Sequence, residues 1–198
     1  MYNFKTVLEK KWGAFKDEDT YYTKQQNIAM YSPRTFLNVL FKPVSMEHYE
    51  KVERVLHCKM PVELLGFYKS YNGIMLFTQS FRIFGVSVED LKSSYATLDF
   101  VYENLAVRKF NPEWDDDMIC FGYYGSRYRF CFHRNSGKKF YVIDRTTLET
   151  IHVFDSIAQL IEFYVKALID EYDEHGIKIH KDPIMKEGPL RNISTEKI

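Results

Sequence analysis

The spacing of hydrophobic positions changes most clearly within residues 59–77. Apolar residues at spacings of three and four predict a helix here, formed around Leu64, Leu65, Tyr68 and Tyr71. Pro61 precedes this stripe, and a first helical turn tolerates both its fixed φ and its missing N–H. Asn72 and Gly73 follow, so we expect Gly73 to adopt a positive φ and to end the helix. The apolar run from Ile74 onward then predicts a buried strand.

Helical periodicity recurs in other parts of the chain. The residues that can cap these further helices are Asn3, Ser45 and either Asp155 or Ser156. Gly13 limits the first helix, whereas the last has an apolar stripe that reaches Tyr172 and is expected to stop at Gly176. Residues 87–106 are compatible with one or two amphipathic helices. Helices are therefore expected on both sides of the 59–77 segment.

Short apolar or alternating runs between turn residues predict strands. The expected strands are 74–78, 81–86, 118–122, 127–133, 139–144 and 150–154. Alternation is cleanest in 127–133. There Tyr128, Phe130 and Phe132 should share one face, opposite a face formed by Arg127, Arg129, Cys131 and His133. Asn135, Ser136 and Gly137 favour a turn, so the following strand should return antiparallel.

The fold class expected from this order of elements is α+β. We predict one domain built on a curled antiparallel sheet of about five or six strands, with helices mainly on one face. Residues 1–44 should form an N-terminal helix and an irregular extension, because 16–44 shows no steady period. The domain should span 45–176, and residues 177–198 should form a loosely ordered tail, since they are polar and contain Gly and Pro.

Charge and composition narrow the classes of partner. The 27 basic and 27 acidic residues balance, so the chain has no global field that attracts nucleic acid or an anionic membrane. Aromatic residues make up 17% of the chain, which favours a strand-rich core. The alternative interpretation is an aromatic surface that binds another protein. We expect no signal peptide at the start of the sequence, and no apolar run reaches the roughly eighteen residues needed to span a bilayer.

The cysteines and histidines do not form a recognisable metal or disulfide pattern. Cys58, Cys120 and Cys131 are odd in number and widely spaced, which favours reduced thiols in the cytoplasm. Although Cys131 and His133 are predicted on the same strand face, two potential ligands do not make a metal site. The sequence also lacks a nucleophile elbow, a phosphate-binding glycine loop, a zinc-protease helix and a deaminase signature. We therefore expect neither enzymatic activity nor a cofactor or metal.

An acidic segment precedes the strand expected at 118–122. It consists of Glu113, Trp114, Asp115, Asp116 and Asp117. Such a run is most often a solvated loop, but an aromatic residue beside carboxylates is also typical of a protein-binding surface. Paired carboxylates for cation binding or acid–base chemistry remain a further alternative. We select this segment as the first candidate for contact with a partner.

A second candidate surface lies on the alternating strand. Arg127 and Arg129, interleaved with tyrosines, could hold phosphates while bases stack, but a neutral chain gives little electrostatic support for nucleic-acid binding. We expect no direct nucleic-acid partner and treat this basic face as an alternative protein contact. Asn72 has a simpler interpretation, because helix capping with Gly73 explains both residues.

Several motifs resemble the SUKH superfamily in its cell-wall-assembly-regulator branch. The matching stretches are 45–56 with Glu53, Met60-Pro61, Phe67-Tyr68, Asn72-Gly73, 81–85, 119–143 and 154–168. Together they span residues 45–170. Met60 stands where the family usually has Leu, and the hairpin lacks the acidic-glycine turn that many members carry.

The resemblance implies a function that the residues alone do not. Bacterial proteins of this branch are chiefly immunity proteins that bind and neutralise polymorphic or contact-delivered toxins, many of them nucleases. The family resemblance therefore predicts a cytoplasmic antitoxin whose partner is a cognate protein toxin, bound stoichiometrically. The same superfamily also allows an intracellular scaffold or regulator, or a small-ligand-binding module, in which Asn72 would line a groove.

Overall fold

The computed structural model describes residues 3–17, 20–22, 25–26, 35–86 and 99–179. Its helices are α1 (Phe4–Trp12), α2 (Met46–Leu56), α3 (Val62–Tyr68), α4 (Phe100–Phe110) and α5 (Ile157–Ile169). Short strands near the N-terminus are β1 (Lys16–Asp17), β2 (Thr20–Tyr22), β3 (Gln25–Gln26), β4 (Thr35–Phe36) and β5 (Val39–Phe41). The remaining strands are β6 (Ile74–Leu76), β7 (Phe81–Ile83), β8 (Met118–Tyr124), β9 (Tyr128–His133), β10 (Phe140–Asp144) and β11 (Thr150–Phe154).

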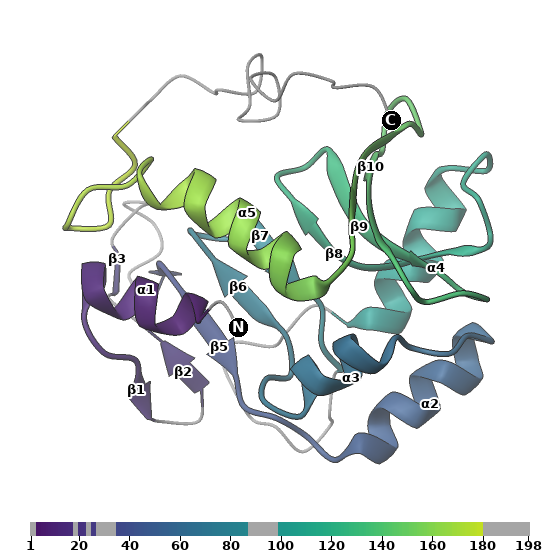
Figure 1. Cartoon of the computed structure of the whole chain (residues 1–198), viewed down its shortest axis with the longest axis horizontal. Helices are drawn as coiled ribbons and strands as arrows, with labels where there is room; N and C mark the ends of the chain where they lie inside the picture. Colours follow the sequence, from purple (N-terminus) through teal and green to yellow (C-terminus); the bar gives the residue numbers. More distant parts are fainter. Residues whose placement is uncertain (1–2, 18–19, 23–24, 27–34, 87–98, 180–198) are drawn as a thin grey trace.

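An antiparallel sheet organises the fold. Within the described residues its order is β1-β2-β5-β6-β7-β8-β9-β10-β11, and β3 pairs with β4 separately. The α+β prediction is confirmed, but the expected five or six strands are too few. Seven strands run from β5 to β11, and the short β1 and β2 extend the β5 edge. Figure 1 shows α1 and α5 side by side across the sheet, with α2, α3 and α4 grouped at one side of it.

Aromatic packing attaches α5 to the sheet. Tyr164 of α5 is fully buried, and its ring lies 5.8 Å from that of Phe81 on β7 and 5.0 Å from that of Phe130 on β9. Helix α1 is held beside α5 through its last turn. There Trp12 donates from Nε1 to the Asp173 carbonyl at 2.8 Å. Both ends of the described chain thus contribute to one core.

The predicted helix start and stop signals are largely confirmed. The side chains of Asn3, Ser45 and Ser156 each accept a hydrogen bond from the first turn of their helix. Gly73 has the predicted positive φ, at 88°, but α3 already ends at Tyr68, so Gly73 does not act as the predicted helix stop. Pro61 differs slightly, because it is the N-cap of α3 rather than a residue of its first turn. The hairpins from β8 to β11 are also confirmed in order and direction.

Irregular structure was wrongly expected across 16–44. Residues 39–41 form β5, which pairs with β6 through Val39–Met75 and Leu40–Ile74. All three β5 residues are buried, so this strand has no polar–apolar alternation and its three residues are too few to show a period. Part of the predicted extension is therefore a sheet strand.

The last helix ends earlier than expected. Residue Ile169 closes α5, and Tyr172 lies in an isolated bridge with Lys178 instead of continuing the helix. Asp173 provides the reason, because its carboxylate accepts from the backbone N–H groups of His175 at 2.9 Å and Ile177 at 2.8 Å. The helix predicted in 87–106 is partly realised as α4, while residues 87–98 and the tail 180–198 lie outside the described residues.

Candidate protein-binding surface

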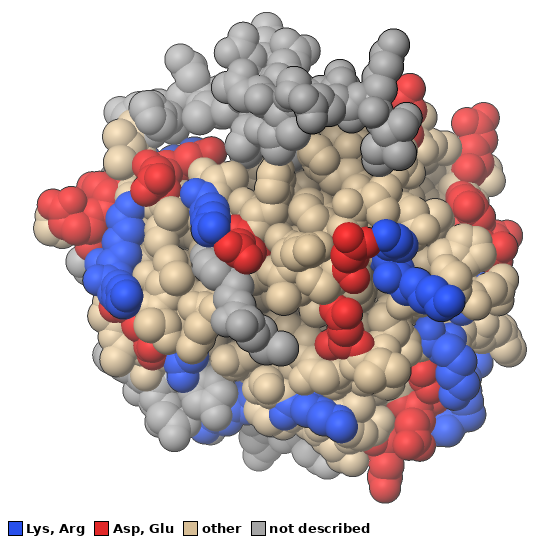
Figure 2. Space-filling model, viewed as in Figure 1, with Lys and Arg blue, Asp and Glu red and all other residues tan. Residues whose placement is uncertain are grey.

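The acidic segment is a short loop between α4 and β8. Helix α4 ends at Phe110 and is followed by its C-cap Asn111, whose side-chain amide donates to the Val107 carbonyl at 2.9 Å. The chain then turns back, and Asp115 accepts a hydrogen bond from the backbone N–H of Asp117 at 2.9 Å. Figure 2 shows acidic side chains along the edge of the molecule where Figure 1 places α4 and this loop.

Trp114 is not available as the surface anchor predicted from the sequence. Its side chain is buried at 5% exposure, and its indole Nε1 donates to the Met118 carbonyl at 3.2 Å. The indole therefore fastens the loop to the start of β8 instead of facing a partner. A single aromatic residue in an acidic run has no periodic context, so the sequence does not show on which side its ring lies.

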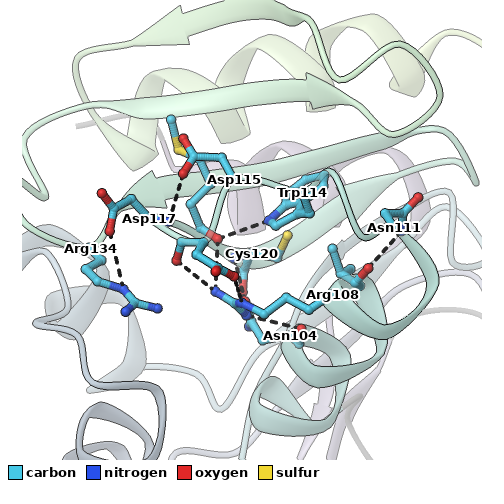
Figure 3. Close-up of polar contacts among 11 residues, drawn as sticks. Asn104, Arg108, Asn111, Trp114, Asp115, Asp117, Cys120 and Arg134 are labelled. Carbon is cyan, nitrogen blue, oxygen red and sulfur yellow. Dashed lines mark hydrogen bonds and ion pairs between the residues drawn. The ribbon is translucent and has the colours of Figure 1, made fainter.

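The acidic side chains differ in how far they are neutralised. Asp116 pairs with Nε of Arg108 at 3.2 Å, and Asp117 lies 3.9 Å from Nε of Arg134. Glu113 and Asp115 are exposed, and no ion pair to either of them occurs within the part of the chain that the structure describes. The loop therefore exposes the carboxylates of Glu113 and Asp115. Figure 3 shows Arg108 and Arg134 beside the loop, with Arg134 directed at Asp117.

Asn104 anchors α4 to the sheet and was not selected from the sequence. Strand β7 ends at Ile83, so the adjacent edge of β8 loses its strand partner there. The fully buried Asn104 amide replaces it, accepting from the Cys120 N–H at 2.9 Å and donating to the Cys120 carbonyl at 2.7 Å. The signal that could have revealed this contact is a polar residue on the apolar face of an amphipathic helix.

Arg108 adds a second connection one turn later. Its Nη2 lies 3.2 Å from the carbonyl of Asp116 and 3.4 Å from that of Met118, and its Nη1 donates to the Asn104 carbonyl at 3.1 Å. A guanidinium has five donors in a rigid plane, which suits such multiple contacts. The helix, the acidic loop and the start of β8 are therefore fixed relative to one another.

The outer face of α4 is unusually apolar. Tyr102, Leu105 and Phe110 are 67%, 56% and 74% exposed, respectively. The inner face consists of the buried Phe100, Asn104 and Val107, so the helix has apolar side chains on both sides. This outer face was not selected from the sequence, since an apolar stripe on a helix is usually buried.

The two arginines of the second candidate surface do not form an exposed basic patch. Arg127 precedes β9 and makes an ion pair with the buried Asp144, at 2.5 Å from Nε to Oδ2. Arg129 is only 8% exposed and its guanidinium lies 5.4 Å from the centre of the Tyr123 ring. Burial lowers the pKa of Arg129 from its ordinary value. Arg129 is thus buried against the sheet, whereas Arg127 is exposed and has its charge balanced by Asp144, so the two do not share an exposed basic face.

Asn72 is buried and hydrogen-bonded inside the protein. Its Oδ1 accepts from the Tyr49 hydroxyl at 2.5 Å and from the Val86 N–H at 2.8 Å, and its Nδ2 donates to the Val86 carbonyl at 2.9 Å. The predicted capping role is not observed, because Lys69 is the C-cap of α3. This side chain joins α2 to the segment after β7, and at 2% exposure it is not accessible to a ligand in a surface groove.

Two adjoining depressions lie between the α2–α3 connection and the turn after β9. Their volumes are about 810 and 440 Å³, and Lys59, Arg134 and Asn135 line both. Cys58 lines the larger one, where burial and the nearby Glu53 raise the pKa of its thiol to about 11. The depressions offer charge and hydrogen bonds but no activated thiolate.

The described cysteines are all reduced. Cys120 and Cys131 lie opposite each other on β8 and β9, with their sulfur atoms 3.4 Å apart, and both are buried. Burial raises the pKa of Cys131 well above its ordinary value. Over the described ranges, no group of three or more His, Cys, Asp or Glu side chains is arranged to hold a metal ion. Nor does any helix there have the length and apolarity needed to cross a membrane.

Comparison with known proteins identifies the family to which the chain belongs. A search of curated proteins found no match. The family model described as SMI1 / KNR4 family (SUKH-1) matches residues 43–162, which is more than half of the chain and covers α2 to the first half of α5. The acidic loop, α4 and the hairpins from β8 to β11 all lie inside the match. The chain therefore belongs to the SMI1 / KNR4 family (SUKH-1).

Proposed function

We propose that this protein is an immunity protein that binds and neutralises a cognate polymorphic or contact-delivered toxin in the bacterial cytoplasm. The toxin is a nuclease, and neutralisation is stoichiometric protein–protein binding. Family membership supports the general role in protein binding, because the SUKH superfamily includes immunity proteins. The observation that carries the proposal here is the acidic loop, which exposes carboxylates on a rigidly held support.

The electrostatics of a nuclease explain why this surface suits it. A nuclease attracts phosphates with Lys and Arg side chains, so its inhibitor gains from a concentrated acidic surface even when its own net charge is zero. Glu113 and Asp115 are exposed, whereas the charge of Asp116 is partly neutralised by its ion pair with Arg108. We therefore assign most of the attraction to Glu113 and Asp115.

Binding without turnover is the mode of action that we propose. Thiolates are strong nucleophiles at neutral pH, but burial raises the thiol pKa of Cys58 and Cys131 and so favours the unreactive protonated form. The acidic loop uses its polar groups for its own turn and for Arg108 and Arg134. These groups are thus suited to recognition.

Co-expression with the product of the adjoining gene tests this function. The toxin gene should carry a substitution that abolishes its activity, and the purified pair should be titrated by calorimetry. We expect a complex of fixed stoichiometry and, with the active toxin, survival of cells only when the immunity protein is present. Protection at strongly substoichiometric amounts would instead indicate turnover, and absence of both binding and protection would exclude the proposed role.

Charge-neutral variants test the contribution of the loop. Replacing Glu113 with Gln and Asp115 with Asn should slow association by about tenfold and flatten its salt dependence, since steering acts on the encounter rate. Exposed loop charges contribute little to stability, so the melting temperature should stay unchanged. The matched control is Glu149→Gln, an exposed acid in the turn between β10 and β11. Wild-type association kinetics in the double variant would place the interface elsewhere.

A further inference from the structure

The outer face of α4 presents a set of large apolar side chains that no other residue in the described part of the chain buries. Tyr102 and Leu105 are three residues apart, and Phe110 follows two turns after Tyr102, so all three belong to one side of the helix. Their exposures of 67%, 56% and 74% place them among the most exposed large hydrophobic residues of the described chain. Grouped exposed aromatics of this kind are typical of interaction sites.

The helix that carries these side chains is held in place unusually well. Asp99 caps its first turn by accepting from the Tyr102 N–H at 2.9 Å, and Asn104 bonds to both polar backbone groups of Cys120. Arg108 and Asn111 fix its last turn. A rigid platform loses little conformational entropy when a partner binds, which favours affinity. The exposed stripe is therefore preorganised.

Charged groups flank the stripe unevenly. The exposed Glu113, Asp115 and Asp116 follow directly after Phe110, while Lys109 is the positive residue on the stripe itself, with its Nζ 5.7 Å from the centre of the Phe110 ring. Glu103 is half-buried, and the positive charges of Arg129 and Arg82 act on it, so it contributes less negative charge to the outer rim. An apolar centre beside a mainly acidic rim fits a partner whose apolar contact residues are surrounded by Lys and Arg.

We propose that Tyr102, Leu105 and Phe110 on α4 form the apolar centre of the toxin interface, with the acidic loop as its charged rim. This inference rests on the proposed function, because its occupant is the basic protein toxin. The apolar centre and the charged rim are expected to affect different rates. Buried aromatic contacts in the centre of an interface mainly set the dissociation rate, whereas rim charges mainly set the association rate. Trp114 takes no part, since its ring fastens the loop from inside.

The test measures both rates for the inactivated product of the adjoining gene by surface plasmon resonance. Tyr102→Ala and Phe110→Ala should each raise the dissociation rate at least tenfold and leave the association rate nearly unchanged. Leu105→Asn, which replaces the apolar branch with a polar amide of the same number of heavy atoms, should act in the same direction. The matched control is Val62→Ala, an apolar residue 85% exposed on α3, which should retain wild-type rates. Melting temperatures check that each variant is folded.

The possible outcomes separate the inference from the function on which it rests. Wild-type dissociation rates in both aromatic variants, with tight binding by the unmodified protein, would overturn the α4 interface and leave the immunity role intact. No binding by the unmodified protein would remove both. Light scattering of the isolated protein supplies a further check. A dimer that Phe110→Ala converts to a monomer would show that a second copy of this chain covers the stripe, contrary to our proposal.

Discussion

Replacing Asn104 with Leu removes the link between α4 and β8 while keeping the number of heavy atoms in the side chain. Asn104 donates to the carbonyls of Phe100 and Cys120 and accepts from the Cys120 N–H, at 2.9, 2.7 and 2.9 Å. Leu at this position leaves both backbone groups of Cys120 without this partner. Each unsatisfied buried group costs about 1–3 kcal/mol, and the added apolar burial offsets about 1 kcal/mol. We expect a loss of about 2–4 kcal/mol in the free energy of unfolding.

Urea denaturation followed by circular dichroism measures this loss. For a chain of this size it corresponds to a fall of about 5–15 °C in melting temperature. The matched control is Asn111→Leu, which removes one partly exposed hydrogen bond at the end of the same helix and should cost about 1 kcal/mol or less. Hydrogen exchange at the Cys120 N–H should accelerate only in Asn104→Leu. A loss under about 1 kcal/mol, or unchanged exchange at Cys120, would refute the view that a side chain completes the sheet here.

Three further predictions concern the backbone and pH. Gly73→Val places a β-branched residue at a φ of 88° and should cost at least about 1–3 kcal/mol, seen as a lower melting temperature. Gly85→Ala should destabilise more strongly, because the new Cβ would lie 2.1 Å from the backbone oxygen of Asn72, whereas Gly66→Ala in α3 meets no atom within 4 Å and should stabilise by about 0.5–1 kcal/mol. Burial lowers the pKa of His152, so this side chain binds a proton more readily in the unfolded chain than in the folded one. The free energy of unfolding should therefore fall as the pH drops below about 6.5 towards the lowered pKa of the folded state. This pH dependence should be weaker in His152→Gln. A pH dependence identical to that of the unmodified protein would exclude this histidine as its source.

Local signals were enough to predict most of the elements. Helix caps at Asn3 and Ser45 and the left-handed Gly73 depend on contacts within a few residues, and each was recognised from its immediate sequence. The β8–β11 hairpins have strong turns and alternation. By contrast, β5 is recognisable only through its pairing with β6, more than thirty residues away along the chain. Its neighbours in space, not its own pattern, make it a strand.

The candidate surface was predicted less completely, for the same reason. The acidic composition of 113–117 is visible in the sequence, but whether Trp114 faces outward depends on its hydrogen bond to Met118. Likewise, Arg127 and Arg129 suggest a basic face until their contacts with Asp144 and Tyr123 are known. Composition thus indicates where charge is concentrated, whereas accessibility is decided by tertiary contacts.

In the interface that we propose, the inner face of α4 makes the contacts that hold the helix on the sheet, and its outer face carries the apolar residues that contact the partner. Asn104 on its inner face substitutes for a missing strand partner, so the helix is fixed to β8 without covering its outer face. That arrangement leaves Tyr102 and Phe110 exposed, at a cost in solubility that a purely structural helix would avoid with polar residues. Stability and recognition should therefore respond to different substitutions. Changes at Asn104 should lower the melting temperature of the free protein, whereas changes at Tyr102 or Phe110 should alter only the lifetime of the complex.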